Sequence, residues 1–382
     1  MKEGWERKKI KEVADVIGGS TPKTNVEEYW GGNNYWVTPA ELDGSKYIEK
    51  TVRCITSNAV DKTNLTLMPS GTVLLSSRAP IGKVCITKAP MYCNQGFKNL
   101  ICKELLYNEF AYYFLKHNVD YLQSLGTGAT FKEISKKVVE NVTIPVPPLS
   151  EQQHIVEELD LLSSIIEKKK AQLNELDNLA QSLFYEMFGD PITNDKGWEV
   201  KKIGEIAESK IGVTYKPTDV NDNGIIVLRS SNIQNSEIDL EDIVRVNCII
   251  KDEKYVRDGD ILMCTRNGSF RLVGKVALIN NLPERMTYGA FMTIIRSQYN
   301  DFLFMYFQLP AFRQQLATAQ TATINQITVK MLNDVKVIVP PLDLQNQFAS
   351  KIEAIEHQKE LIKLSIKEVE TLFNSRMDYY FN

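Results

Sequence analysis

The sequence predicts an α+β protein made of two copies of one unit, each a sheet-bearing domain followed by a long helix. Three observations support this fold class. Motifs recur with an offset of about 193 residues, short β-rich runs alternate with turn residues in each copy, and each copy ends in a heptad pattern. We therefore expect domains over residues 1–148 and 189–341, and spacer helices over residues 149–188 and 342–382.

The repeat is seen in short motifs that return in the same order. Each copy opens with Gly-Trp-Glu, continues with a β-rich run that ends in arginine and precedes Gly-Lys-Val, and closes with Val-Pro-Pro-Leu. The paired motifs are Gly4-Trp5-Glu6 with Gly197-Trp198-Glu199, Gly82-Lys83-Val84 with Gly274-Lys275-Val276, and Val146-Pro147-Pro148-Leu149 with Val339-Pro340-Pro341-Leu342. This ordered series indicates an internal duplication.

The first part of each copy is expected to hold a mainly antiparallel sheet with some helix. Runs rich in β-branched and apolar residues are separated by Gly, Asn, Ser and Pro, which favour turns. The expected strands cover residues 71–76, 83–87, 225–228, 260–264 and 275–279, and helical stretches cover residues 107–117 and 302–312. This mixture is typical of an α+β domain.

The second part of each copy begins after the double proline, where a new helix can start. Ser150 with Gln153, and Asp343 in the second copy, are the expected capping residues. Apolar residues then follow at alternating spacings of four and three, which predicts a coiled-coil seam shared by the two helices. The predicted seam residues are Leu159, Leu162, Ile166, Leu173, Leu176, Ile352, Ile355, Ile362, Ile366 and Val369.

Two lysines, Lys169 and Lys359, also fall on this seam. We expect their ammonium groups to reach past the apolar contacts into water. The alternative is that each seam is only the buried face of an ordinary core helix.

The formal charge of −3 is unevenly distributed along the chain. Residues 1–148 hold 19 Lys and Arg against 15 Asp and Glu, and residues 189–341 hold 18 of each. The acidic excess lies in the predicted helices, with 3 basic against 8 acidic residues over 149–188 and 5 against 7 over 342–382. The sheet domains are therefore neutral or mildly basic, which permits nucleic-acid binding without requiring it.

The sequence offers little for catalysis, cofactors or metals. The six cysteines form no Cys-x-x-Cys pair, so we expect reduced, mostly buried thiols. Gly274-Lys275 resembles part of a phosphate loop, but Val276 stands where a Ser or Thr would bind magnesium. No apolar stretch suits a membrane span or signal peptide, so we expect a cytoplasmic protein. We expect no catalytic site, no cofactor and no metal.

Polar residues at the ends of expected strands are candidate DNA contacts. Arg78 and Arg266 end equivalent strands, and arginine can bind guanine with two hydrogen bonds. Lys83 and Lys275 would contact phosphates. The further candidates are Ser77, Thr21, Lys23, Thr130, Lys132, Asn267, Thr214, Lys216, Arg229, Thr323 and Asn325. For each of these the alternative is a solvated loop or turn, and for the two arginines a structural salt bridge.

Two further motifs resemble a known family. They are the run Gly19-Ser20-Thr21-Pro22-Lys23 before Tyr29-Trp30-Gly31, and the run Pro147-Pro148-Leu149-Ser150-Glu151-Gln152 before the heptads. Together they resemble Type I restriction-modification specificity subunits, and the resemblance covers essentially the whole chain. The second copy departs from both motifs, with Thr214-Tyr215-Lys216-Pro217 and Leu344-Gln345 in their places.

This resemblance implies that each domain is a target-recognition domain for one half of a split duplex target. It implies that the helices form an antiparallel coiled coil that sets the spacing between half-sites. It also implies two methyltransferase subunits and restriction motor-nuclease subunits as partners, with no catalysis by this chain. An autonomous modification enzyme and a coiled-coil scaffold without a nucleic-acid role are the alternatives.

Overall fold

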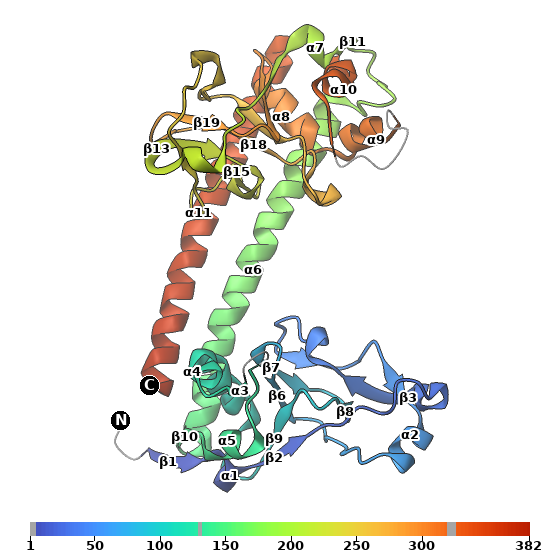
Figure 1. Cartoon of the computed structure of the whole chain (residues 1–382), viewed down its shortest axis with the longest axis vertical. Helices are drawn as coiled ribbons and strands as arrows, with labels where there is room; N and C mark the ends of the chain where they lie inside the picture. The colour runs from blue at the N-terminus through green and yellow to red at the C-terminus, as the bar shows by residue number, and fades with distance from the viewer. Residues whose placement is uncertain (1–4, 129–131, 319–325) are drawn as a thin grey trace. The chain divides into compact units, whose positions relative to one another are not determined.

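The computed structural model describes residues 5–128, 132–318 and 326–382, which form two compact units. Unit 1 comprises residues 1–170 and 363–382, and unit 2 comprises residues 171–362. Each unit therefore combines one sheet domain with one part of both long helices. Figure 1 labels the elements along the chain.

Unit 1 is built around a five-stranded sheet in the order β2-β9-β6-β7-β4. Only the β4–β7 pair is parallel. Its strands are β2 (Ala14–Gly18), β4 (Tyr47–Ile48), β6 (Val73–Ser77), β7 (Ile81–Thr87) and β9 (Lys98–Cys102). The smaller sheets are β5-β3-β8, formed by β3 (Trp30–Val37), β5 (Cys54–Ile55) and β8 (Tyr92–Cys93), and the pair β1 (Glu6–Lys9) and β10 (Thr143–Val146).

Helices cover one side of this sheet. The aromatic run Phe110 to Phe114 of α3 is fully buried, and α3 packs on β6 and β7 (Figure 1). The helices of the domain are α1 (Ile10–Val13), α2 (Ser57–Lys62), α3 (Asn108–His117), α4 (Val119–Ser124) and α5 (Lys136–Asn141), with 3-10 turns at Glu27–Tyr29 and Pro39–Glu41. The expected strands and helix of this domain are confirmed.

Unit 2 repeats most of these elements in the same order, with the 3-10 turn Asp252–Lys254 in place of α2 and a hairpin over residues 233–238 in place of β4. Its main sheet, β12-β20-β17-β18, is antiparallel throughout. The strands are β11 (Glu199–Lys202), β12 (Glu208–Ile211), β13 (Val220–Leu228), β14 (Ile233–Gln234), β15 (Glu237–Ile238), β16 (Arg245–Val246), β17 (Ile261–Cys264), β18 (Val276–Leu278), β19 (Met286–Tyr288), β20 (Met292–Arg296) and β21 (Lys336–Val339). The α+β class and the internal repeat are therefore confirmed.

One predicted helix of unit 2 is split in the structure. The stretch over residues 302–312 forms the end of α8 (Asn300–Gln308) and the start of α9 (Pro310–Thr318). Leu309 is extended because a residue before proline avoids the helical conformation. The other helices are α7 (Ile203–Ile206) and α10 (Val329–Asp334), with 3-10 turns at Pro217–Asp219, Ser230–Asn232, Asp252–Lys254 and Phe270–Leu272.

The long helices α6 (Leu149–Phe188) and α11 (Leu342–Phe381) contain 40 residues each. Both begin directly after the double proline, so Ser150 and Asp343 lie inside the first turn and the expected capping positions are wrong. Gln152, not Gln153, fixes the start of α6. It is fully buried, its amide nitrogen donates to the carbonyls of Pro147 (2.8 Å) and Leu105 (2.9 Å), and its oxygen accepts from the backbone N–H of Tyr107.

The two helices pack against each other within each unit, in opposite directions. In unit 1, Glu158 binds Arg376 and Lys170 lies 3.6 Å from Glu370. In unit 2, Lys359 lies 2.8 Å from Asp177, and the Phe184 and Phe348 ring centroids are 5.8 Å apart. Rising numbers in α6 meet falling numbers in α11 in both units, so the antiparallel arrangement is confirmed.

Seam side chains lie between these contacts. Leu159 is fully buried, and Leu162, Ile166, Ile355 and Ile366 are nearly so. The remaining seam residues, Leu173, Leu176, Ile352, Ile362 and Val369, are half-buried.

The expectation that Lys359 reaches into water is wrong, because its ammonium group forms ion pairs with Asp177 and Glu356.

Neither long helix carries an apolar stretch able to cross a bilayer, and no other helix among residues 5–128, 132–318 and 326–382 does.

Candidate nucleic-acid interface

The first candidate surface lies at the end of β6 in unit 1, where loops from distant parts of the chain meet. The Ser77 N–H donates to the Gly96 carbonyl at 2.8 Å, which joins β6 to the loop before β9. Arg78 pairs with Glu133 across an isolated antiparallel bridge. Thr21, in the loop after β2, hydrogen-bonds Gln95. Arg78, Glu133, Gln95 and Thr21 therefore belong to one group of loops.

Arg78 is partly exposed and loosely paired. Its side chain is 37% accessible, and its Nη1 lies 3.9 Å from the Glu133 carboxylate. Lys98 Nζ approaches the other oxygen of Glu133 at 3.3 Å. Ion pairs this exposed contribute at most about 1 kcal/mol. The Arg78 guanidinium can therefore leave Glu133 for another acceptor at small cost.

Two residues of unit 1 that were predicted to contact DNA have side chains that bind other parts of the domain instead. Ser77 is fully buried and its Oγ accepts from Lys98 Nζ at 3.2 Å, so it has no surface to offer DNA. Lys83 Nζ donates to the carbonyls of Pro39 (3.0 Å) and Leu42 (2.9 Å). Its ammonium group therefore stabilises this turn and is not free to bind a phosphate. We therefore do not propose Ser77 or Lys83 as DNA contacts. A lysine after a strand looks the same in sequence whether its ammonium group faces a carbonyl or water.

The other candidates of unit 1 lie in the loop after β2 and in the loop before α5. Lys23 and Lys132 are exposed and Thr21 is half-exposed, while Thr130 lies outside the described residues. The loop that carries Lys23 is held by two tryptophans, because Trp30 Nε1 donates to the Lys23 carbonyl at 3.3 Å and Trp36 Nε1 to the Ser20 carbonyl at 3.1 Å. The sequence reasoning missed Gln95 and Lys98, which become neighbours of Arg78 only through strand pairing.

The second candidate surface lies at the end of β17 in unit 2 and has the same backbone connections. The Thr265 N–H donates to the Phe291 carbonyl at 2.9 Å, and Arg266 pairs with Gln326 across an isolated bridge. Ile327 N donates to the Thr265 carbonyl, as Ile134 N donates to that of Ser77 in unit 1. The residues around the two arginines can therefore be matched one by one.

The chemistry around the second arginine is different. Phe291 stands where unit 1 has Gly96, its side chain is 57% exposed, and the Arg266 guanidinium lies 5.6 Å from its ring centroid. Gln326 stands in the place of Glu133, and buried Thr293 in that of Lys98. Arg266 is exposed, and within the described part of the chain it has no acidic partner. A cavity of about 240 Å³ lies beside it, lined in part by Ile211, Thr265, Arg266, Gln326 and Thr293.

Two further candidates in unit 2 have internal partners. Asn267 donates to Ser230 Oγ at 3.0 Å and accepts from the Ser269 N–H at 2.9 Å. Arg229 pairs with the Asp242 carboxylate at 2.9 Å. Both polar groups therefore stabilise turns. The Arg229–Asp242 pair is as exposed as the Arg78–Glu133 pair, so DNA contacts by Arg229 and Asn267 stay predictions.

The remaining predicted residues of unit 2 differ in exposure. Thr214 and Lys216 are exposed in the loop after β12, and Lys275 is half-buried. Thr323 and Asn325 lie outside the described residues.

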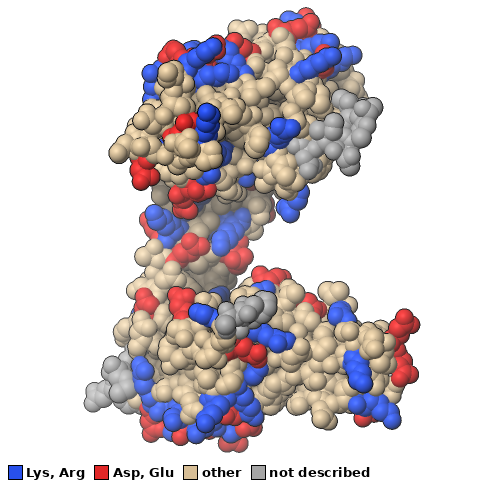
Figure 2. All heavy atoms as spheres, in the orientation of Figure 1, with Lys and Arg blue, Asp and Glu red and all other residues tan. Residues whose placement is uncertain are grey.

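Charge on the visible faces of both units is mixed. Figure 2 shows Lys and Arg side chains interspersed with Asp and Glu over each domain. Such a surface limits sequence-independent attraction to phosphates. Specific base contacts would then carry more of the discrimination.

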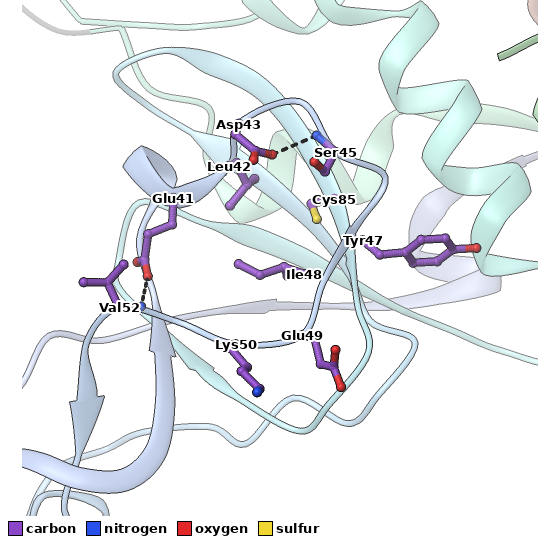
Figure 3. Close-up of a pocket in the computed structure, with 10 residues that line it drawn as sticks. All are labelled: Glu41, Leu42, Asp43, Ser45, Tyr47, Ile48, Glu49, Lys50, Val52 and Cys85. Atoms are coloured by element: carbon purple, nitrogen blue, oxygen red, sulfur yellow. Dashed lines mark hydrogen bonds between the residues drawn. The ribbon is translucent and has the colours of Figure 1, made fainter. Parts of the chain in front are cut away.

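A cavity of about 290 Å³ in unit 1 is lined by three acidic residues, Glu41, Asp43 and Glu49, together with Lys50 and uncharged side chains (Figure 3). Glu41 accepts from the backbone N–H groups of Thr38 (2.8 Å) and Val52 (2.7 Å), and Asp43 accepts from that of Ser45 (2.9 Å). The hydrogen bond from Ser45 holds the pKa of Asp43 below its usual value. These carboxylates shape the loop, and their charge makes this cavity a poor site for DNA.

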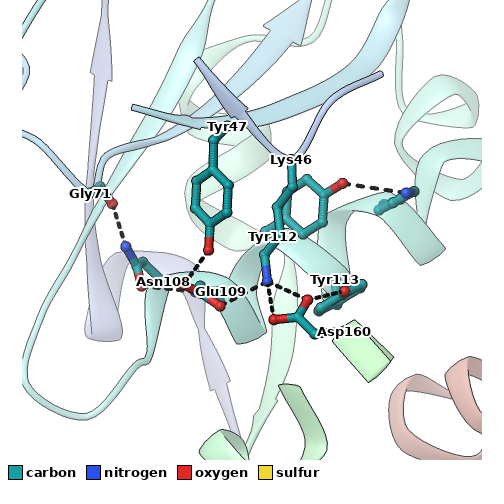
Figure 4. Close-up of polar contacts among 9 residues, drawn as sticks. Lys46, Tyr47, Gly71, Asn108, Glu109, Tyr112, Tyr113 and Asp160 are labelled. Atoms are coloured by element: carbon teal, nitrogen blue, oxygen red, sulfur yellow. Dashed lines mark hydrogen bonds and ion pairs between the residues drawn. The ribbon is translucent and has the colours of Figure 1, made fainter. Parts of the chain in front are cut away.

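A polar cluster joins the sheet domain of unit 1 to α6 (Figure 4). Lys46 Nζ lies 2.7 Å from the Glu109 carboxylate and 2.5 Å from that of Asp160, and the Tyr47 and Tyr113 hydroxyls bind the same two acids. Burial acts to raise the pKa of Glu109, but hydrogen bonds from Lys46 and Tyr47 outweigh it, and the pKa lies below its usual value. The cluster fastens the loop before β4 to α3 and α6.

Thiol chemistry is not favoured in the sheet domains. All six cysteines are free. Burial raises the pKa of Cys85 to about 11 and that of Cys93 to about 12, so both stay protonated near neutral pH. Among residues 5–128, 132–318 and 326–382, no group of three or more His, Cys, Asp or Glu is placed to hold a metal ion.

Known proteins share both the sequence pattern and the fold. A model of the Type I restriction modification DNA specificity domain matches residues 2–178 and again residues 195–371. The Type I restriction enzyme MjaIX specificity subunit of Methanocaldococcus jannaschii is 31% identical over 94% of this chain and 90% of its own length. The EcoKI specificity subunit of Escherichia coli is 22% identical over 93% of this chain and 82% of its own.

Solved structures agree with the fold. One, from a study of complex assembly and conformational transition in the type I R-M system, has a TM-score of 0.63 and 19% identity, covering 100% of this chain and 98% of that chain. The S subunit of a Type-I restriction-modification system from M. genitalium has a TM-score of 0.54 and 15% identity. That match covers 99% of this chain and 96% of the M. genitalium chain. The expected resemblance is confirmed. With the family model matched once in each repeat, this chain belongs to the Type I restriction-modification DNA specificity family.

Proposed function

We propose that this chain is the specificity subunit of a Type I restriction-modification complex, and that each sheet domain reads one half of a split duplex DNA target. The observation that carries this proposal is the pair of equivalent arginine turns. Arg78 and Arg266 occupy the same place in the repeated fold but have different neighbours. Two domains that share one fold but place different side chains around their arginine suit a DNA target with two different halves.

The proposed readers are residues 1–148 and 189–341, with the helices over 149–188 and 342–382 as spacers. Arg78 and Arg266 would bind base edges, since arginine binds guanine O6 and N7 together. The exposed lysines would contact phosphates and position each domain. The remaining proposed contacts are Thr21, Lys23, Gln95, Lys132, Thr214, Lys216 and Lys275.

The helix pair would fix the separation of the half-sites. Each helix contributes to both units and would be roughly 60 Å long at 1.5 Å per residue. Readers on such a spacer engage half-sites separated by about one or more helical turns of DNA, or multiples of 34–36 Å.

Catalysis is assigned to partner subunits, with two methyltransferase subunits and motor-nuclease subunits as the proposed partners. Exposed leucines at equivalent positions, Leu179 (51%) and Leu372 (50%), give each long helix an apolar side chain for docking. Methylation would require the partner to flip the base out of the duplex. This role also places the protein with the chromosome in the cytoplasm.

The test is equilibrium binding of the full chain to duplex DNA at several salt concentrations, followed by selection from a random duplex library. A reader that contacts phosphates loses affinity steeply as salt rises and enriches a bipartite motif. Binding that ignores salt, or no enriched motif, would favour the scaffold alternative. Methyl transfer by the purified chain alone would favour an autonomous enzyme.

A further inference from the structure

The residue paired with each reader arginine differs between the two domains. Glu133 faces Arg78 in unit 1, and Gln326 takes the same backbone position beside Arg266 in unit 2. Each is followed by an isoleucine and a hydroxyl residue, Ser135 or Thr328, that caps the next helix. The frame around this position is thus preserved while its side chain changes.

A second residue changes together with it. Lys98 lies next to Glu133 and binds Ser77 Oγ at 3.2 Å. In unit 2, Thr293 takes its place, with its hydroxyl 3.1 Å from that of Thr265. The domain with the acid carries the extra cation, and the domain with the neutral amide lacks it. Local charge balance is therefore kept in both domains.

Both side chains are partly exposed beside their arginine. Glu133 is 41% exposed, and its charge is partly neutralised by Arg78 at 3.9 Å and Lys98 at 3.3 Å, which lowers its repulsion of phosphates. Gln326 is half-exposed and lines the cavity beside Arg266. A base next to the one bound by the arginine would then lie close to this side chain in each domain.

We propose, building on the function proposed above, that Glu133 and Gln326 are specificity-determining residues that make the two domains prefer different bases. A carboxylate only accepts hydrogen bonds and matches the N4 amino group of cytosine. A carboxamide both donates and accepts and matches N7 and N6 of adenine. The first half-site then contains a cytosine and the second an adenine, each beside the base bound by the arginine.

The test uses the full chain with Glu133→Gln or Gln326→Glu and repeats the library selection. Glu133→Gln shifts one position of one half-site from cytosine to adenine, and Gln326→Glu makes the reverse change in the other half-site. Each base-preference ratio changes by roughly 5- to 150-fold. Controls are Glu140→Gln on α5 and Gln314→Glu on α9, which make the same changes of charge and leave both half-sites as they are.

A paired variant separates base reading from folding. Lys98→Thr with Glu133→Gln rebuilds the neutral pair of unit 2 inside unit 1, so it restores any thermal stability lost in Glu133→Gln alone and keeps the adenine preference. Variants that change affinity for all sequences alike, with unchanged base preferences, would overturn this inference and leave the proposed function standing. A wild-type chain that enriches no motif would overturn the proposed function itself.

Discussion

The two places where a sheet domain meets the long helices share their apolar contacts and differ in their polar ones. In unit 1, Phe110 packs on Phe381 with ring centroids 5.1 Å apart, and in unit 2 Phe302 packs on Phe188 at 5.0 Å. Among the described residues of unit 2, the polar cluster around Lys46 has no counterpart, because Asp301 takes the place of Glu109 and lies near the acid Glu353. The repeat therefore preserves the aromatic pair that sets the junction and varies the charges around it.

The largest expected effect tests the aromatic pairs that the two junctions share. Phe110→Ala and Phe302→Ala should each lower the free energy of unfolding of their own unit by about 3–5 kcal/mol, because both rings are buried. Hydrogen exchange followed by mass spectrometry reports each unit separately. The exposed controls Leu105→Ala and Ile249→Ala should stay within about 0.5 kcal/mol of the wild type. A large loss in only one unit would break the equivalence of the two aromatic pairs.

The next effect tests the polar cluster around Lys46, in which the two junctions differ. Lys46→Met leaves Glu109 and Asp160 facing each other without a cation, and should destabilise unit 1 by about 1–3 kcal/mol after allowance for the exposure of Asp160. Urea unfolding of a Trp198→Phe background reports unit 1, since the other tryptophans, Trp5, Trp30 and Trp36, all belong to it. Lys50→Met, at an exposed site, is the control. Unchanged stability of Lys46→Met would contradict a stabilising role for this cluster in unit 1.

A smaller effect is the opposite pH dependence of the two junctions. The pKa of Glu109 is lowered in the folded chain, so its contribution to stability is present above the unfolded pKa near 4.5 and is lost as pH falls through the folded value. Partial burial, followed by the charge of Glu353, raises the pKa of Asp301 above 3.8, so its ionisation costs stability as pH rises through the folded value.

Urea unfolding between pH 3 and pH 7 measures this difference. Glu109→Gln should reduce the loss of stability of unit 1 at acid pH, to which Asp43 and Glu158 also contribute. Asp301→Asn should leave unit 2 as stable at pH 7 as the wild type, or more stable. Loss of stability in Asp301→Asn at pH 7 would contradict the assigned direction.

Sequence reasoning reached the repeat, the strand positions and the long helices because these depend on local periodicity and on turn residues such as Pro147 and Pro148. It also placed Arg78 and Arg266 at strand ends. It did not foresee that Ser77 is buried, that Lys83 binds carbonyls, or that Gln152 fixes α6, because each depends on partners brought close only by tertiary folding. Glu133 lies far from Arg78 in sequence, so their pairing was equally hidden.

The most direct test of the two-reader account compares Arg78→Ala with Arg266→Ala in selection from a random duplex library. We expect Arg78→Ala to relax base preference by roughly 5- to 150-fold in one half-site and Arg266→Ala to do so in the other. Arg285→Ala, which removes an arginine held by Asp252 and Tyr255, is the control and should leave both half-sites unchanged. Loss of the same half-site in both variants, or an equal loss on every sequence, would contradict the account.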